Sequence, residues 1–315
     1  MIKRRKYKLF SILVSGVLVF SLVPTLKANA LVEENNVIVN NIDDSDDIKV
    51  RDINTKSETT VTKSQYTKDV NGILPTTNDV IDENSTSAYI PKGLQVKQPK
   101  RGSIIGTDDR VKITNTKVFP YTAICYIQIV FPNNKTYIGT AWMYAKDVAV
   151  TAGHCVYSAA DGGWAKSIEV VPACNGSTRP YGSTFSKQIS APKGWINKRS
   201  SDYDWGVIQL NDNIGDRTGY FGAYRTSKSL KGKNVDITGY PGEKSMTLWN
   251  MKGKIKSCTN RRVSYTIDTT GGQSGCPVYT NDYRAIAIHT TGSSKINGGT
   301  RISKALFDYI DTFRK

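Results

Sequence analysis

Short apolar or alternating segments recur along the last two thirds of the chain. They cover residues 122–130, 137–145, 205–210, 234–238 and 285–290, and Gly, Asn, Asp and Pro residues separate them. Many short strands joined by turns are typical of a β-barrel or a β-sandwich. A helix is expected at the C-terminal end, where Ser303 can cap the first turn and four apolar residues share one face: Leu306, Phe307, Ile310 and Phe313. The region from residue 103 onward is therefore predicted to be all-β with a terminal helix.

The first 30 residues have the pattern of a secretory signal. Five basic residues lie within the first eight, an apolar segment runs from Phe10 to Val23, and Ala28 and Ala30 provide the small side chains that a signal peptidase recognises. The apolar segment is short for a membrane span, and no later segment is apolar enough to cross a bilayer. We therefore predict a signal peptide over 1–30, a secreted, extracellular protein, and no stable membrane association after cleavage. The alternative is an uncleaved anchor helix.

Residues 31–102 differ in composition from the region that begins at residue 103. They contain no Cys, Trp or His, and Asp, Asn, Ser, Thr and Lys dominate. Such a segment cannot bury enough apolar surface to fold stably alone. It ends in the basic residues Lys97, Lys100 and Arg101, followed by Gly102. We interpret 31–102 as a largely unstructured propeptide that an activating protease removes, and 103–315 as the mature domain. The alternative is a disordered linker or cell-wall spacer.

The net charge of +16 is unevenly distributed. Residues 1–30 carry +6, residues 31–102 carry −3, and residues 103–315 carry +13. The basic residues of the last region are scattered and form no nucleic-acid-binding motif, so a solvated basic surface is favoured and no nucleic-acid partner is expected. The positive field could instead attract acidic substrates.

The five cysteines are Cys125, Cys155, Cys174, Cys258 and Cys276. An exported chain meets an oxidising environment, so at least one disulfide is feasible. Because the count is odd, at least one thiol must stay free or pair between chains, and the sequence leaves the connectivity open.

Three local motifs supply the parts for nucleophilic hydrolysis. The segment Thr151-Ala152-Gly153-His154-Cys155 follows a predicted strand, Asp204 opens the apolar strand 205–210, and residues 271–275 read Gly-Gly-Gln-Ser-Gly. The glycines permit a tight turn that exposes the Ser274 hydroxyl and directs the backbone N–H groups of Gly272 and Ser274 at one point, as an oxyanion hole requires.

The order His, Asp, Ser along the chain is that of the chymotrypsin arrangement. In that arrangement Ser274 attacks the carbonyl, His154 accepts and returns the proton, and Asp204 orients the imidazole. Asp202 is the rival acid, and Asp204 is preferred because it directly abuts the apolar strand. Each motif is common alone, but the three together predict a serine peptidase of two six-stranded antiparallel β-barrels.

The chain contains only two histidines, His154 and His289. A histidine-based metal site therefore has few ligands, no His-Glu-x-x-His motif is present, and neither a metal nor a cofactor is expected. Taken alone, His289 is best interpreted as a buried, hydrogen-bonded core residue.

Residues 103–315 resemble the bacterial glutamyl endopeptidases, the branch of the chymotrypsin clan that includes the staphylococcal V8 protease and the Bacillus enzymes. Four segments carry the resemblance: 103–110 (Ser-Ile-Ile-Gly-Thr-Asp-Asp-Arg), 239–242 (Gly-Tyr-Pro-Gly), 268–275 (Asp-Thr-Thr-Gly-Gly-Gln-Ser-Gly) and 287–290 (Ala-Ile-His-Thr). The resemblance implies that Thr269 and His289 line the primary specificity pocket. Both can donate hydrogen bonds to a glutamate carboxylate, and a partly charged His289 would add attraction.

Three positions depart from the pattern of these relatives. Gly139 stands where many Bacillus enzymes have a cysteine that pairs with the cysteine after the catalytic histidine, here Cys155. Cys276 replaces the usual serine. Asp268 lies six residues before Ser274, where trypsin has its cation-binding aspartate, so specificity for Lys or Arg is the main rival. The glutamate-specific Bacillus enzymes also have an acid there.

In chymotrypsin-like zymogens, the N-terminal amine created by cleavage pairs with an aspartate immediately before the nucleophile. Here that residue is Gln273, whose side chain is uncharged. An ion pair at this residue is therefore excluded as the activation switch. The resemblance implies instead that the new terminus, at Gly102 or Ser103, lies near the specificity pocket.

The sequence thus predicts a monomeric serine endopeptidase that cuts protein or peptide substrates after Glu, with Asp as the second candidate residue. Two alternatives stay open: trypsin-like specificity through Asp268, and a catalytically silent binding module on the same fold.

Overall fold

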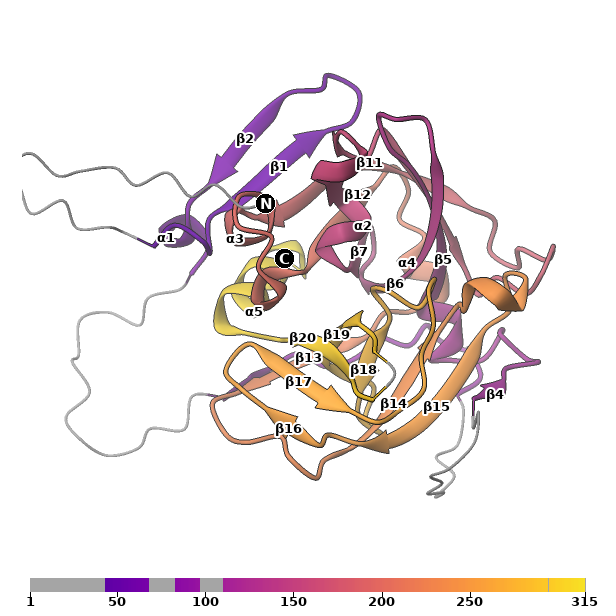
Figure 1. Ribbon diagram of the computed structural model, residues 1–315. Coiled ribbons are helices and arrows are strands. Elements are labelled where there is room, and N and C mark those ends of the chain that lie inside the picture. Colours follow the sequence, from indigo (N-terminus) through magenta and orange to yellow (C-terminus); the bar gives the residue numbers. More distant parts are fainter. Residues whose placement is uncertain (1–42, 68–82, 97–109, 294, 315) are drawn as a thin grey trace, which may run out of the picture. The chain divides into compact units, whose positions relative to one another are not determined.

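The computed structural model describes residues 43–67, 83–96, 110–293 and 295–314 (Figure 1). The predicted signal peptide and the predicted processing point at 97–103 lie outside the described residues. Within those residues, no helix has both the length and the apolar character that a membrane span needs.

The first β-sheet of the domain closes into a six-stranded barrel. Its strands are joined in the order β10-β5-β6-β7-β12-β11, and β10 pairs with β11 to complete the circle. They are β5 (Ile124–Val130), β6 (Thr136–Ala145), β7 (Val148–Thr151), β10 (Ser167–Pro172), β11 (Thr184–Pro192) and β12 (Gly206–Leu210). The apolar segments at 122–130, 137–145 and 205–210 are therefore strands, as predicted.

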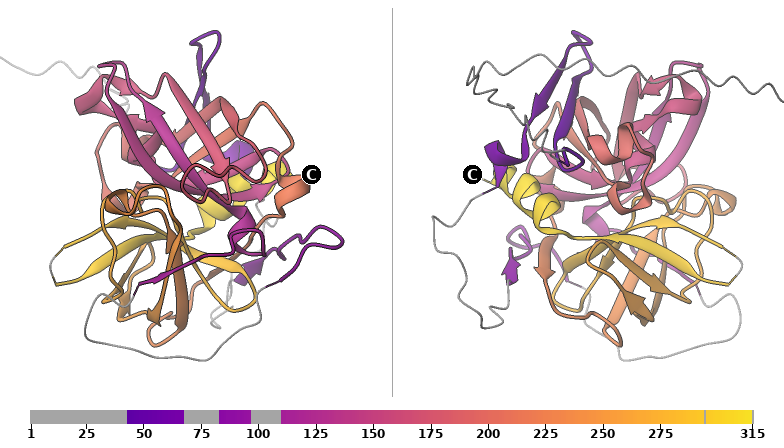
Figure 2. Two further views of the ribbon diagram at one scale, coloured as in Figure 1. Left: turned by 90° about the vertical axis from the view of Figure 1, so that its right-hand side faces the viewer. Right: turned by 60° about the vertical axis from the view of Figure 1, so that its left-hand side comes forward.

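The second β-sheet forms a half-barrel. Its main path is β16-β17-β20-β19-β18-β14-β15-β4, and β13 adds to it in parallel beside β19. Most of this sheet is drawn in orange and yellow in Figure 2. Its two end strands, β16 and β4, are each two residues long and do not pair with each other among the described residues. The fold class is confirmed, with one closed barrel and one half-barrel. The strands are β4 (Val111–Lys112), β13 (Gly222–Thr226), β14 (Asn234–Gly239), β15 (Trp249–Lys254), β16 (Ser257–Cys258), β17 (Arg262–Tyr265), β18 (Pro277–Tyr279), β19 (Arg284–Thr291) and β20 (Asn297–Arg301).

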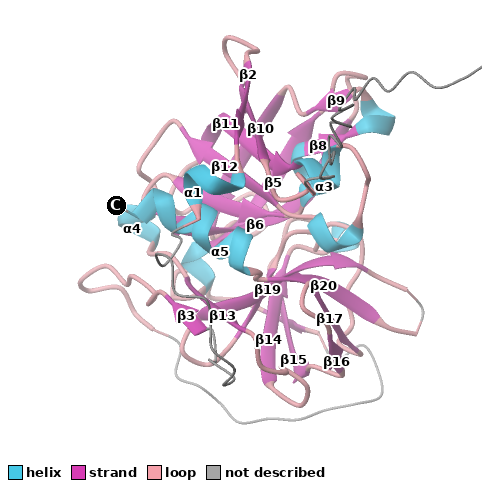
Figure 3. Ribbon diagram, turned by 90° about the vertical axis from the view of Figure 1, so that its left-hand side faces the viewer, coloured by secondary structure: helices cyan, strands magenta, loops and turns pink. Residues whose placement is uncertain are grey.

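The C-terminal helix α5 (Lys304–Asp311) packs against the barrel (Figure 3). The Ser303 hydroxyl accepts a hydrogen bond from the Leu306 N–H at 3.2 Å, which is the predicted cap. The Tyr309 hydroxyl donates to the Ser190 hydroxyl of β11 at 3.0 Å, or accepts from it. The other helices are single turns: α1 (Lys63–Tyr66), α2 (Gly153–Val156), α3 (Lys193–Ile196) and α4 (Gly215–Thr218). A small hairpin, β8 (Tyr157–Ser158) and β9 (Gly163–Trp164), comes directly after α2.

The described part of the predicted propeptide has regular structure, which its composition did not indicate. Strand β1 (Ile48–Asp52) pairs with β11 of the barrel and with β2 (Glu58–Val61), and β3 (Glu83–Ser85) pairs with β13. These strands are formed by pairing with the edges of existing sheets, so they need no apolar core of their own.

Candidate active site

His154 and Asp204 meet at the mouth of the closed barrel. His154 lies on the single turn α2 after β7, and Asp204 lies two residues before β12, which pairs with β7. Asp204 Oδ2 lies 2.9 Å from His154 Nδ1, and Oδ1 accepts the backbone N–H of His154 at 3.0 Å. Asp204 is buried, whereas about a third (34%) of the His154 side chain is exposed. No contact of this kind joins His154 to Asp202 within the described residues.

The surroundings of His154 favour its charged form. Burial lowers the pKa of His154, but the Asp204 carboxylate and the sulfur of Cys155 raise it, and the net pKa lies well above its ordinary value of 6.5. An imidazole whose charged form is stabilised in this way can accept a proton during the reaction. The ring is also near Trp195 of α3, with 6.2 Å between the ring centroids.

Ser274 lies in the tight turn that precedes β18, and this turn packs against the mouth of the closed barrel. The Ser274 carbonyl accepts the Thr140 N–H at 2.9 Å. Gly275 has a φ of +90°, and a Cβ at this position would lie 2.2 Å from Thr140 O and Thr151 Oγ1. The predicted requirement for glycine after the nucleophile therefore has a steric cause. In the described residues no hydrogen bond joins the Ser274 hydroxyl to the His154 ring, and such bonds often tighten only when substrate binds.

The backbone N–H groups of Gly272 and Ser274 are available to an oxyanion. Neither has an acceptor among the hydrogen bonds of the described residues, whereas the intervening Gln273 N–H donates to Thr270 O at 3.2 Å. Gly272 has a φ of +93°, and a Cβ there would lie 2.6 Å from Tyr240 O. Only glycine fits this conformation and this space.

A buried arginine holds the nucleophile turn from the side of the N-terminal segment. Arg110 Nη1 donates to Thr270 Oγ1 at 3.0 Å and to Gln273 Oε1 at 3.4 Å, and its Nη2 pairs with Glu243 Oε1 at 2.9 Å. The Gln273 side chain is 1% exposed and its Oε1 also accepts the Thr270 N–H at 3.0 Å. The uncharged side chain of Gln273 is therefore held by two donors, the Thr270 backbone amide and the Arg110 guanidinium.

The glutamate of this anchor is ionised more readily than usual. Burial alone would raise the pKa of Glu243, but hydrogen bonds from Thr270 and Arg110 lower it below its usual value. Glu243 therefore stays negatively charged and keeps its ion pair with Arg110.

His289 lies on β19 beside the nucleophile turn. Its carbonyl accepts the Gly275 N–H at 2.7 Å, and its ring Nδ1 lies 2.7 Å from the Tyr265 hydroxyl. Burial, the charge of His154 and the charge of Arg262 together lower the pKa of His289 to about 3. Burial beside the positive charge of Arg262 therefore favours a neutral His289 near pH 7, in contrast to the expectation of a partly charged ring.

The two other candidates for the specificity pocket differ in burial. The Thr269 hydroxyl is buried and has no hydrogen-bond partner in the part of the chain that the structure describes. Asp268, the residue on which a trypsin-like specificity would depend, is exposed, and its backbone N–H donates to the Met251 sulfur at 3.0 Å. A cation pocket of the trypsin kind needs a recessed carboxylate, which this position does not provide.

All five cysteines are described and all are free, and four of them are buried. A Cβ added to Gly139 would lie 3.1 Å from Cys155 Sγ, so the two positions are neighbours, as the family pattern implies. Cys155 lacks a disulfide because its neighbour is glycine.

The sequence interpretation missed three residues of this region. Arg110, Arg262 and Tyr265 lie far along the chain from the groups that they contact, and none belongs to a catalytic motif. Arg262 Nη1 donates to Thr290 Oγ1 at 2.9 Å and to the Ser201 carbonyl at 2.7 Å, which links the half-barrel to the segment before Asp204. The one available signal was that Arg110 belongs to a segment that resembles the family.

Comparison with known proteins agrees with this geometry. A family model described as a trypsin-like peptidase domain matches residues 139–288. The "Glutamyl endopeptidase" of Bacillus licheniformis is 38% identical over 73% of this chain and 75% of its own length. The "Extracellular metalloprotease" of Bacillus subtilis is 39% identical over 82% of this chain and 84% of its own length. A solved "Structure of Glu endopeptidase in complex with MPD" shares 33% identity at a TM-score of 0.61 and covers 67% of this chain and 98% of that one.

The fold and these similarities define a serine endopeptidase. The chain belongs to the glutamyl endopeptidase family. The name of the Bacillus subtilis relative describes a metalloprotease, but the described residues of this chain contain no group of three or more His, Cys, Asp or Glu side chains that could hold a metal ion.

Proposed function

We propose that this protein is a secreted, extracellular serine endopeptidase that hydrolyses peptide bonds after glutamate, with His154, Asp204 and Ser274 as its catalytic triad. The observation that carries the specificity is the buried Thr269 hydroxyl without a partner, together with a neutral His289. An unpaired buried hydroxyl is costly, and a substrate carboxylate would satisfy it.

In the proposed mechanism, His154 removes the proton of the Ser274 hydroxyl as the serine oxygen attacks the scissile carbonyl carbon. The Asp204 carboxylate holds Nδ1 in its protonated tautomer and stabilises the imidazolium that forms. The N–H groups of Gly272 and Ser274 donate to the oxyanion of the tetrahedral intermediate. His154 then returns the proton to the leaving amine, and water hydrolyses the acyl-enzyme in the same way.

The proposed pocket recognises the glutamate side chain by hydrogen bonds from neutral donors. In the proposed tautomer the Tyr265 hydroxyl donates to His289 Nδ1, so the neutral ring carries its proton on Nε2 and can donate it to a carboxylate. The Thr269 hydroxyl supplies a second donor. The nearby positive charge of Arg262 would favour a negatively charged side chain without direct contact.

Activation is proposed to require cleavage near Gly102 and Ser103, after which the protein acts as a monomer on protein or peptide substrates. The new terminus is proposed to complete the pocket, because the nucleophile turn is already anchored through Arg110. An activating protease is therefore a required partner.

A peptide series that varies only the residue before the scissile bond tests the specificity. We expect efficient cleavage after Glu, weak cleavage after Asp, and none after Lys or Arg. Thr269→Val should lower kcat/KM for Glu peptides about 10- to 100-fold, the size of a hydrogen bond to a charged group. Asp268→Asn is the matched control and should leave the preference unchanged. Cleavage after Lys that is lost in Asp268→Asn would overturn the glutamate assignment, and failure of an organophosphorus reagent to label Ser274 would overturn the mechanism.

A further inference from the structure

The part of strand β11 that does not pair with β10 carries a surface to which the predicted propeptide binds. Strand β10 pairs with β11 only at Thr184 and Phe185, so the rest of this edge is open to another strand. Strand β1 fills it with an antiparallel ladder from Ile48 opposite Pro192 to Asp52 opposite Gln188. This is strand addition, in which backbone hydrogen bonds provide much of the affinity.

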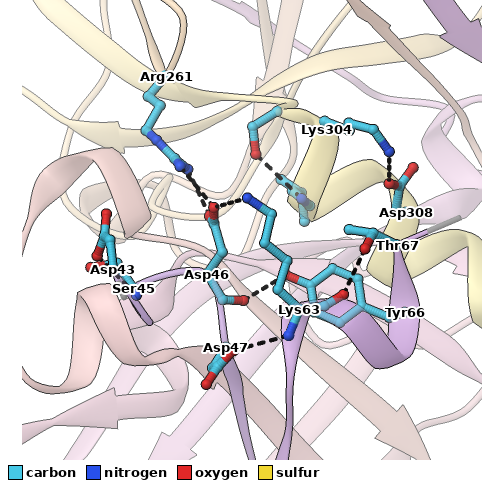
Figure 4. Close-up of polar contacts among 12 residues, drawn as sticks. Asp43, Ser45, Asp46, Asp47, Lys63, Tyr66, Thr67, Arg261, Lys304 and Asp308 are labelled. Atoms are coloured by element: carbon cyan, nitrogen blue, oxygen red, sulfur yellow. Dashed lines mark hydrogen bonds and ion pairs between the residues drawn. The ribbon is translucent and has the colours of Figure 1, made fainter. Parts of the chain in front are cut away.

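Acidic residues ahead of β1 meet basic residues of the predicted mature domain. Arg261 forms an ion pair with Asp46 at 3.0 Å, and Lys193 Nζ lies 2.9 Å from Asp44 and 3.1 Å from Asp47 (Figure 4 shows the contact of Arg261). The Asp46 side chain is 9% exposed, so the carboxylate of this pair is largely shielded from solvent, whereas the Arg261 side chain is 26% exposed. The same segment is bound through its backbone, because the Lys193 N–H donates to Asp47 O at 2.7 Å.

Two apolar side chains anchor this piece, residues 43–67. Ile48 is fully buried and belongs to the main hydrophobic core. Tyr66 is 5% exposed, its ring lies 5.5 Å from that of Tyr309 on α5, and its hydroxyl donates to Asp46 O at 2.5 Å.

A second piece, residues 83–96, is bound elsewhere on the domain. Strand β3 pairs with β13, and Tyr89 stacks on Tyr220 with 4.8 Å between ring centroids. The Phe119 N–H donates to Gln95 O at 2.7 Å, and Arg314 donates to Ser87 O at 2.7 Å. Because one chain connects the two pieces, release of one leaves the other to hold it at high effective concentration.

None of the described contacts of these two pieces involves His154, Asp204 or Ser274. They also lie entirely on the N-terminal side of the processing point near residue 102, so cleavage there breaks none of them. We propose that processing leaves residues 43–96 bound as a non-covalent second chain, and that the surface formed by β11, Lys193 and Arg261 is a docking site for an extended acidic segment, here the chain's own propeptide. This inference rests on the proposed processing point.

The test uses the full precursor with Ser274→Ala and a site-specific protease sequence in place of residues 97–101. After complete cutting, size-exclusion chromatography at low salt with mass spectrometry should find both fragments in one peak. Asp43 pairs with Lys198 at 3.2 Å, so replacing Asp43, Asp44, Asp46 and Asp47 by Asn removes the partners of Lys193, Lys198 and Arg261 and should raise the release rate at least about tenfold. Arg261→Gln should raise it by a smaller factor, because Asp46 keeps its contact with Lys63 of the same segment at 3.0 Å. Asp212→Asn removes an exposed ion pair with Arg217 and is the matched control, with no change expected.

Elution of the wild-type fragment as a separate peak at low salt and micromolar concentration would overturn the proposal. If the fragment stays bound and its release rate is the same in the Asp→Asn variant, in Arg261→Gln and in the unsubstituted protein, the assigned surface is wrong. Both readouts are independent of catalysis, so they stand apart from the peptide-series and labelling tests of the proposed function.

Discussion

Replacing Gly139 by Cys should create a disulfide with Cys155 that this protein lacks. The Cβ of the new residue would lie 3.1 Å from Cys155 Sγ. In a disulfide of ordinary bond lengths, each Cβ lies about 3 Å from the opposite sulfur, so little backbone movement is needed. The obstacle is Ile127, whose side-chain atoms lie 3.1 and 3.2 Å from the same Cβ position.

The expected gain depends on the length of the loop and on this crowding. The bridge closes a loop of about 15 residues, which corresponds to a stabilisation of about 3 kcal/mol. Moving the Ile127 side chain aside costs about 1 kcal/mol, at the lower end of overpacking penalties. A net gain of about 2 kcal/mol corresponds to a rise in Tm of about 4 to 8 °C for a domain of this size.

Thermal unfolding of oxidised and reduced Gly139→Cys protein, made in the Ser274→Ala background, measures this gain. Gly139→Ala is the matched control, because it adds the Cβ without the sulfur and isolates the crowding by Ile127. The variant has six cysteines, so thiol titration of the oxidised form should find four free thiols. The reasoning is refuted if the oxidised, folded variant forms no bond between residues 139 and 155, or if the bonded form melts below Gly139→Ala.

Three further results are expected. Ser274→Ala should fold normally and lose hydrolysis by roughly 10⁴- to 10⁶-fold, measured by peptide turnover and circular dichroism, and wild-type turnover would contradict the proposed nucleophile. Catalysis needs neutral His154, and the pKa of His154 is raised, so kcat/KM should increase with pH through an apparent pKa above 6.5. Because the pKa of His289 is about 3, the pH profiles for Glu substrates and for uncharged substrates should be the same near neutrality. A second titration step seen there only with Glu substrates would argue against a neutral His289. Arg110→Ala should lower the rate of acylation by an active-site reagent about tenfold or more, while the melting temperature changes by only a few degrees. Arg110→Lys should restore part of the acylation rate, and Arg217→Ala should have no effect. Equal acylation rates in the wild type and in Arg110→Ala would mean that the anchor does not position the turn.

Strands and motifs that depend on nearby residues could be predicted from the sequence. The apolar segments 122–130 and 205–210 form strands because their own side chains fill the barrel, and Ser303 caps α5 through a contact three residues away. The His154 and Asp204 motifs could be found because each lies beside a strand end that determines its position.

Features that depend on distant partners could not be predicted in this way. Strands β1 and β2 lack a strong apolar alternation, and β1 is held by the open edge of β11, more than 130 residues later in the chain. The lowered pKa of His289 depends on burial and on the charges of His154 and Arg262, and the anchor of Gln273 depends on Arg110. In each case the interaction is set by tertiary packing, which local sequence patterns do not contain.

The anchor of the nucleophile turn has a consequence for alkaline conditions. An α-amino group loses its charge at pH values of about 8, so a turn that a new N-terminus holds by an ion pair loosens as the pH rises. Arg110 keeps its charge throughout that range, and Gln273 has no proton to lose. Assembly of the proposed oxyanion-binding turn should therefore be insensitive to alkali, and any loss of rate at high pH must arise at another group.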